Sequence, residues 1–142
     1  MARKPSRAIR LIGIAALLWN LLGLFALGMN TYVTYEMPEM LTPIERAMAD
    51  ATPVSTVVGG FVAVASGILG SIGLIFFRGW SLPLFIFSLM AVIVQGVGIF
   101  LTARSMGVVL SAASTLTQTS VFIVAVILIL YAAQARAVGA LR

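Results

Sequence analysis

The 142-residue chain is 61% hydrophobic and 9% charged, whereas a water-soluble domain carries roughly 25% charged residues to solvate its surface. Its net charge of +5 does not indicate nucleic-acid binding, because four of its nine basic residues precede the first apolar run and the others are scattered singly. The absence of cysteine and histidine excludes disulfide and iron–sulfur chemistry, and it removes the commonest metal ligand and general base.

The first apolar run extends from Leu11 to about Val33 and is interrupted only by Asn20 and Asn30. It is long enough to cross a hydrocarbon core of about 30 Å, which takes about 20 helical residues. Its basic start also fits a cleaved signal peptide, but the run exceeds the usual apolar region of about 7–15 residues. We expect a retained transmembrane helix, with the signal peptide as the alternative.

The outer loop, residues 34–53, contains every acidic residue of the chain. Within it, Thr42 and Glu45 have the spacing of a capping box, with a proline at the first helical position between them. We expect a short amphipathic helix from Pro43 to about Ala51, ended before Pro53. The sequence therefore predicts a structural role for Glu45 rather than a catalytic one.

The second apolar run, residues 54–77, carries a row of small residues at every fourth position. In lipid, helices gain little from hydrophobic burial against each other, so close backbone approach has to hold a bundle together. The row predicts either packing against the first or third helix within the chain, or a face for a homo-oligomer or a membrane protein complex. The residues of this predicted packing or interaction face are Ser55, Gly59, Ala63, Gly67, Gly70 and Ser71.

Two further apolar runs cover residues 82–103 and 118–135. Ser81 is a plausible N-cap for the first of these, because Pro83 then falls in the first turn, where its missing N–H does no harm. The segment 104–117 is rich in serine, alanine and threonine, and it fits a helix extension, a re-entrant turn or a loop. We favour the helix extension. The fold class is therefore all-α: a bundle of four transmembrane helices in one domain, residues 1–142.

Two amides lie inside the apolar runs. Counting about 1.5 Å per residue places Asn20 near the middle of the membrane and Gln95 somewhat beyond it, toward the outer face. We expect their partners to be each other, a backbone carbonyl, Ser66 or Ser88. The amides then act as hydrogen bonds between helices or as a polar lining for a small uncharged ligand.

The distribution of lysine and arginine predicts the orientation. With four spans, both termini and the second loop share one side of the membrane, and that side holds most of the basic residues. The positive-inside rule therefore places both termini on the cytoplasmic side of the membrane. The basic residues on that side are Arg3, Lys4, Arg7, Arg10, Arg78, Arg136 and Arg142, against Arg46 and Arg104 on the other.

No ionisable residue lies well inside a span, which argues against proton-coupled transport by one subunit. The chain also lacks a phosphate-binding loop, a nucleophile elbow and any metal-ligand spacing. We therefore expect no enzymatic activity, no cofactor and no metal. The function we favour is a non-catalytic accessory or interaction component of the membrane. The alternative is an oligomeric permease or facilitator for a small neutral solute.

The sequence also resembles a family of small four-helix bacterial inner-membrane proteins of unknown function, some of which are loosely labelled sugar transporters. The matching residues are Trp19-Asn20 with Gly23, Thr42-Pro43-x-Glu45 with Pro53, Gly67-x-x-Gly70-Ser71-x-x-Leu74, Arg78-Gly79-Trp80 and Pro83-Leu84-Phe85-x-x-Ser88-Leu89. The resemblance covers roughly residues 10–100 and departs in the outer loop, where such proteins have more aromatic residues. It implies a four-helix fold in the plasma membrane and carries over no binding residue.

Overall fold

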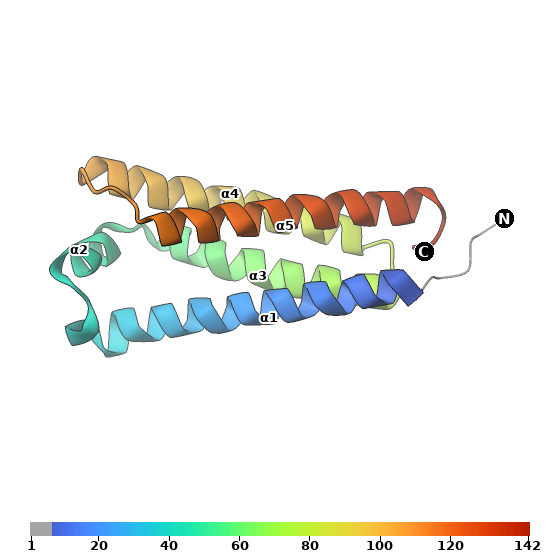
Figure 1. Ribbon diagram of the computed structural model, residues 1–142, viewed down its shortest axis with the longest axis horizontal. Helices are drawn as coiled ribbons and strands as arrows, with labels where there is room; N and C mark the ends of the chain where they lie inside the picture. The colour runs from blue at the N-terminus through green and yellow to red at the C-terminus, as the bar shows by residue number, and fades with distance from the viewer. Residues whose placement is uncertain (1–6) are drawn as a thin grey trace.

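A computed structural model describes residues 7–142, and these residues form helices joined by turns, with no strand among them. Four of the helices are long and apolar enough to cross a membrane, so the chain is a multi-pass helical membrane protein, as the sequence predicts. Figure 1 shows them as a bundle with α2 at one end and the start of α1 and the C-terminus at the other. The helices are α1 (Arg7–Glu36), η1 (Pro38–Met40), α2 (Pro43–Ala51), α3 (Val54–Ile75), α4 (Ser81–Ser105) and α5 (Ala112–Ala137).

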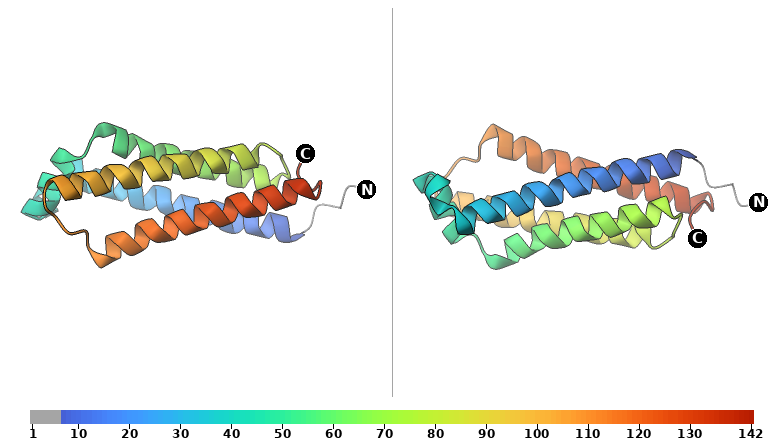
Figure 2. Two further views of the ribbon diagram at one scale, coloured as in Figure 1. Left: turned by 90° about the horizontal axis from the view of Figure 1, so that it is seen from above. Right: turned by 90° about the horizontal axis from the view of Figure 1, so that it is seen from below.

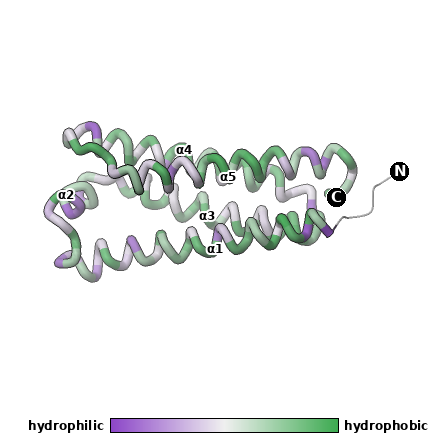
Figure 3. Tube along the Cα trace, in the orientation of Figure 1, coloured by the Kyte–Doolittle hydropathy of each residue, from purple (hydrophilic) through white to green (hydrophobic). Residues whose placement is uncertain are grey.

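The end of the bundle that carries α2 is called the α2 end below, and the opposite end is called the terminal end. Hydrophilic residues concentrate toward these two ends, whereas the middles of the four long helices are mostly hydrophobic (Figure 3). This distribution suits a bilayer, because a hydrocarbon core leaves charged groups unsolvated and solvates apolar side chains well. Arg3 and Lys4, which contribute to the predicted orientation, lie outside the described residues.

The short helix α2 begins and ends where the sequence predicts. The Thr42 N–H donates to Glu45 Oε2 at 2.8 Å, and the Glu45 N–H donates to Thr42 Oγ1 at 3.3 Å, which completes the capping box. The hydrogen bond from the Thr42 backbone, and then the one from its hydroxyl, lower the pKa of Glu45. The Arg46 guanidinium donates to the Pro38 carbonyl and ties α2 to η1.

Two predicted helix starts need correction. The N-cap of α4 is Trp80 rather than Ser81; Ser81 is already helical, and its buried hydroxyl has no hydrogen-bond partner among the described residues. The sequence favours an extension of the last helix through 104–117, but α5 begins only at Ala112. The Ser111 hydroxyl caps its start by accepting from the Ser114 N–H at 3.1 Å. Between α4 and α5 the chain turns instead, with Gly107 at a φ of +66°, a conformation that glycine adopts without steric cost.

Helix α3 is the centre of the bundle. It packs along α1 on one side and along α4 on the other, and α5 packs along α4. The row of small residues explains this position, because a helix without bulky side chains admits two neighbours at short range. Helices α1 and α5 form no comparable interface along their lengths. In both views of Figure 2, α5 diverges from α4 toward the α2 end.

The terminal end is closed by an apolar core and by the last residues of the chain. Leu74, Phe85 and Ala132 are almost completely buried there, together with Ala140 and Leu141. Two backbone hydrogen bonds join the last residue to the turn between α3 and α4. The Arg142 N–H donates to the Phe77 carbonyl at 2.8 Å, and the Gly79 N–H donates to the Arg142 carbonyl at 2.6 Å.

Candidate functional site

A cavity of about 280 Å³ lies between α1, α3, α4 and α5, across the middle of the bundle. Its volume is near the lower limit of small-molecule sites, which span roughly 300–1,000 Å³. Phe85 and Leu128 line its deep end, next to the apolar core. The side chains with hydrogen-bonding groups in its wall are Trp19, Asn20, Asn30, Ser88, Gln95, Thr117 and Gln118.

The predicted small-residue row lies largely inside the chain. Gly59, Ala63, Gly67, Gly70 and Ser71 are buried on α3, whereas Ser55, at the α2 end of that helix, is exposed. A Cβ at Gly59 would lie 3.6 Å from the Ala91 carbonyl oxygen, and one at Gly70 would lie 2.9 Å from the Phe85 ring. The residues of the row are therefore packed against other helices of the same chain. The row therefore offers little free surface to a partner.

Asn20 lies against Gly67 across the α1–α3 interface. A Cβ at residue 67 would come within 2.1 Å of Asn20 Oδ1, so the glycine makes room for the amide. Asn20 Nδ2 donates to the Ala16 carbonyl at 2.8 Å. A backbone carbonyl is one of the partners expected from the sequence, but this one is on α1 itself, so the bond does not join two helices. The Oδ1 atom accepts no hydrogen bond from residues 7–142.

Gln95 occupies an equivalent position on α4, against Gly60 of α3. A Cβ at Gly60 would lie 2.7 Å from Gln95 Nε2. The Gln95 side chain makes no hydrogen bond to another described residue, and the same holds for Asn30. Gln95 and Asn20 therefore do not bond to each other, and neither bonds to Ser66 or Ser88. A hydrogen bond that does join two helices here runs from Ser88 Oγ on α4 to the Ala63 carbonyl on α3, at 2.7 Å.

Three polar residues of the cavity are missing from the sequence-based candidates: Asn30, Thr117 and Gln118. Asn30 was accessible to sequence reasoning, because Asn20, Leu27 and Asn30 follow a spacing that places them on one helix face. Gln118 stands at the predicted boundary of the last span and carried no such signal. In the structure its Nε2 lies 3.5 Å from the Val92 carbonyl, at the limit of a hydrogen bond.

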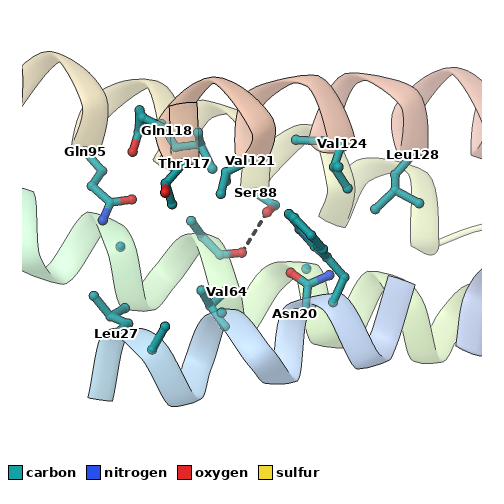
Figure 4. Close-up of a pocket in the computed structure, with 18 of the residues that line it drawn as sticks. Asn20, Leu27, Val64, Ser88, Gln95, Thr117, Gln118, Val121, Val124 and Leu128 are labelled. Carbon is teal, nitrogen blue, oxygen red and sulfur yellow. Dashed lines mark hydrogen bonds between the residues drawn. The ribbon is translucent and has the colours of Figure 1, made fainter. Parts of the chain in front are cut away.

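The polar groups are unevenly distributed in the cavity. Figure 4 shows Gln95, Thr117 and Gln118 gathered toward the α2 end, with Val124 and Leu128 toward the terminal end. Within residues 7–142, no aspartate, glutamate, lysine or arginine lines the cavity. An amide offers two donors and an acceptor with two lone pairs, so this arrangement can hydrogen-bond an uncharged molecule but cannot neutralise a charged one.

A second hollow of about 150 Å³ continues the cavity toward the α2 end. It shares Leu27, Asn30 and Gln95 with the cavity, and Ala49 of α2 and Thr52, the residue that caps α2, form part of its wall. The hollow therefore lies between the polar end of the cavity and α2. The short helix covers the hollow from the side of the outer loop.

The described residues provide no group of histidine, cysteine, aspartate or glutamate that could hold a metal ion. The resemblance to small inner-membrane proteins stays a prediction. No protein-family model matches the chain, and no curated protein or solved structure matches it either.

Proposed function

We propose that this chain is a non-enzymatic protein of the bacterial plasma membrane that binds a small uncharged molecule in the cavity between its four long helices. This function corresponds to the ligand-binding step of a facilitator. The observation that carries the proposal is a set of amides from Asn30, Gln95 and Gln118. Among the described residues, these amides face a cavity without charged side chains and are unpaired or weakly paired.

The energetic argument is that a polar group shielded from water costs roughly 1–3 kcal/mol when it lacks a hydrogen-bond partner. A cavity surrounded by apolar helices in a bilayer gives its amides few partners among lipid tails. A ligand with hydroxyl, carbonyl or amide groups supplies those partners and so gains affinity. Ionised ligands are disfavoured, because nothing in the wall compensates for their charge.

The orientation predicted from the charges supports a site that faces the outer side. Arg7, Arg10, Arg78 and Arg136 all belong to the terminal end, where the apolar core closes the bundle. If the positive-inside rule holds here, the closed end is cytoplasmic and the polar end of the cavity lies in the outer half of the membrane. The cavity then receives its ligand from outside the cell or from the outer leaflet.

Two glycines of α1 provide a matched test. Gly23 lines the cavity, and a Cβ there would meet only Val64, at 3.8 Å, whereas a Cβ at Gly28 would meet nothing within 4 Å. Gly23→Leu fills the cavity, and Gly28→Leu adds the same side chain to an open position outside its wall. Native mass spectrometry of chains extracted from membranes should show an uncharged adduct on the wild type and on Gly28→Leu, and its loss from Gly23→Leu. A chain without any adduct, or equal adducts on both variants, contradicts the proposal.

A second candidate, the accessory or interaction component favoured by the sequence, is supported by α5. Residues 111–117 are all exposed, and α1 and α5 lack an extensive interface, so a partner helix would find an uncovered seam there. The hydroxyls of this region, such as Thr119 and Ser120, donate to carbonyls of their own helix. Crosslinking in native membranes from Leu116 tests this candidate. A strictly monomeric particle without a co-purifying partner counts against it.

A further inference from the structure

We infer that the molecule bound in the cavity is an uncharged single-chain amphiphile of the monoacylglycerol class. Its hydroxyl and carbonyl groups lie among Gln95, Thr117 and Gln118, and its hydrocarbon chain leaves between α1 and α5 into the lipid. This inference rests on the proposed function and adds the chemistry of the ligand and its route of entry.

The first reason is the polarity gradient of the cavity. Two amides and a hydroxyl gather at the end near α2, whereas the wall toward the other end is mostly apolar, with Val124 and Leu128 (Figure 4). The two polar side chains of that part, Asn20 and Ser88, already donate to backbone carbonyls. A sugar or another fully polar solute would leave its own hydroxyls unpaired against that apolar wall, at a cost for each. A molecule with a polar head and an apolar chain matches both halves.

The second reason is that the cavity is small and has an uncovered side. Its volume of about 280 Å³ is below the usual range of sites that enclose a whole drug-sized ligand, so a long acyl chain does not fit inside it. Its walls on α1 and α5, which include Ala26 and Ala125, belong to two helices that do not pack along each other. Trp19, on the α1 side of this seam, is 41% exposed. The chain of a bound amphiphile can therefore extend into the surrounding lipid.

The third reason concerns the head group. The part of the chain that the structure describes contributes no ionisable side chain to the wall, so a phosphate would be buried without a counter-charge. Amides both donate and accept hydrogen bonds, and the hydroxyl groups of a glycerol monoester do the same, while its ester carbonyl accepts. A quinone or a hydrocarbon would leave the acceptor oxygens of Gln95 and Asn30 without a donor.

The inference is tested by native mass spectrometry of the full chain with three probes: monooleoylglycerol, oleoyl lysophosphatidic acid and glycerol. We expect one monooleoylglycerol per chain, with weaker binding of the phosphate-bearing lipid and no binding of glycerol. Gln95→Leu and Gln118→Leu should each weaken binding about tenfold, the effect of one lost hydrogen bond, and Gln134→Leu, an exposed position at the other end of α5, should not.

The position of the chain is tested by tryptophan fluorescence. The protein has two tryptophans, so Trp80→Phe leaves Trp19 as the single reporter at the seam. Monooleoylglycerol brominated on its chain should quench this fluorescence with saturation at one molecule per protein, and it should quench only without saturation when Trp19→Phe leaves Trp80 alone.

The outcomes separate the inference from the proposed function. Binding of glycerol but not of monooleoylglycerol overturns the inference and leaves the cavity as a site for neutral solutes. Equal binding of the phosphate-bearing lipid, or unchanged binding in both glutamine variants, overturns it as well. If none of the probes binds while the membrane-derived adduct still depends on Gly23, the inference fails and the proposed function stands.

Discussion

The two ends of the bundle are built from the same four helices, but they pack in different ways. At the terminal end, Leu74, Phe85 and Ala132 interlock, and backbone bonds from Arg142 fasten the turn between α3 and α4. At the α2 end, Gln95 and Gln118 stand between helices that diverge. A membrane bundle is held by close contacts rather than by hydrophobic burial. At the α2 end, α3 and α4 remain in close contact, and the space lies on the side of α5. The terminal end therefore stabilises the fold, whereas the α2 end is available for binding.

The largest effect should come from replacing glycines along α1 by alanine. A Cβ at Gly13, in the terminal half, would lie 2.8 Å from Ile75 Cγ1 and 3.0 Å from the Ile75 backbone nitrogen, whereas one at Gly28 would meet nothing within 4 Å. Gly13→Ala should lower the free energy of unfolding by about 1–3 kcal/mol, because the packed backbones have to move apart.

Gly28→Ala is the matched control and should leave stability unchanged or slightly raised, since alanine favours helix. Unfolding of both variants in mixed detergent micelles measures the difference. Equal losses at residues 13 and 28 would mean that the two ends do not differ in packing.

A smaller effect is expected at the contact between Gly67 and Asn20. An alanine at residue 67 displaces Asn20 Oδ1 and strains the bond from Asn20 Nδ2 to the Ala16 carbonyl, which should cost about 0.5–1.5 kcal/mol. The double variant Gly67→Ala/Asn20→Ala removes the obstructing side chain and should recover most of the loss. The same unfolding assay gives the coupling between the two sites, and strictly additive effects would show that they do not touch.

The smallest effect concerns pH at α2. Hydrogen bonds from Thr42 lower the pKa of Glu45 from its ordinary value of 4.5, so folding of α2 favours the ionised carboxylate. This contribution is fully present above the ordinary pKa and is lost as the pH falls through the lowered one. The NMR shift of the Thr42 amide in micelles should follow that acid titration and should cease to titrate in Glu45→Gln. An identical titration in the variant would contradict the capping-box assignment.

The elements that sequence reasoning predicted well depend on short-range physics. Hydropathy over about 20 residues placed the four long helices, and the three-residue spacing of Thr42 and Glu45 placed α2. The cavity depends on the distance between helices, and a short sequence pattern does not predict that distance. Gln118 illustrates this limit, because it lies at the boundary of a predicted span and becomes part of the wall only through the divergence of α5.

For the packing of α3 too, the sequence predicts the local feature but not the three-dimensional arrangement. Its small residues indicated close approach, but the sequence left open whether the partner belongs to the same chain. Asn20 and Gln95, which the sequence singled out as polar residues within apolar runs, both line the cavity. Their actual neighbours, Gly67 and Gly60, follow from helix register across an interface, which requires the three-dimensional arrangement.

The most direct test of an open α2 end and a closed terminal end is electron spin resonance on paired spin labels. The chain has no cysteine, so labels can be attached at lipid-exposed pairs on α1 and α5: Phe25 with Leu116 toward the α2 end, and Leu11 with Leu130 at the terminal end. We expect a narrow distance distribution for the terminal pair, and a broad one for the α2-end pair that narrows when monooleoylglycerol is added. Narrow distance distributions at both ends that do not change when monooleoylglycerol is added would contradict the account.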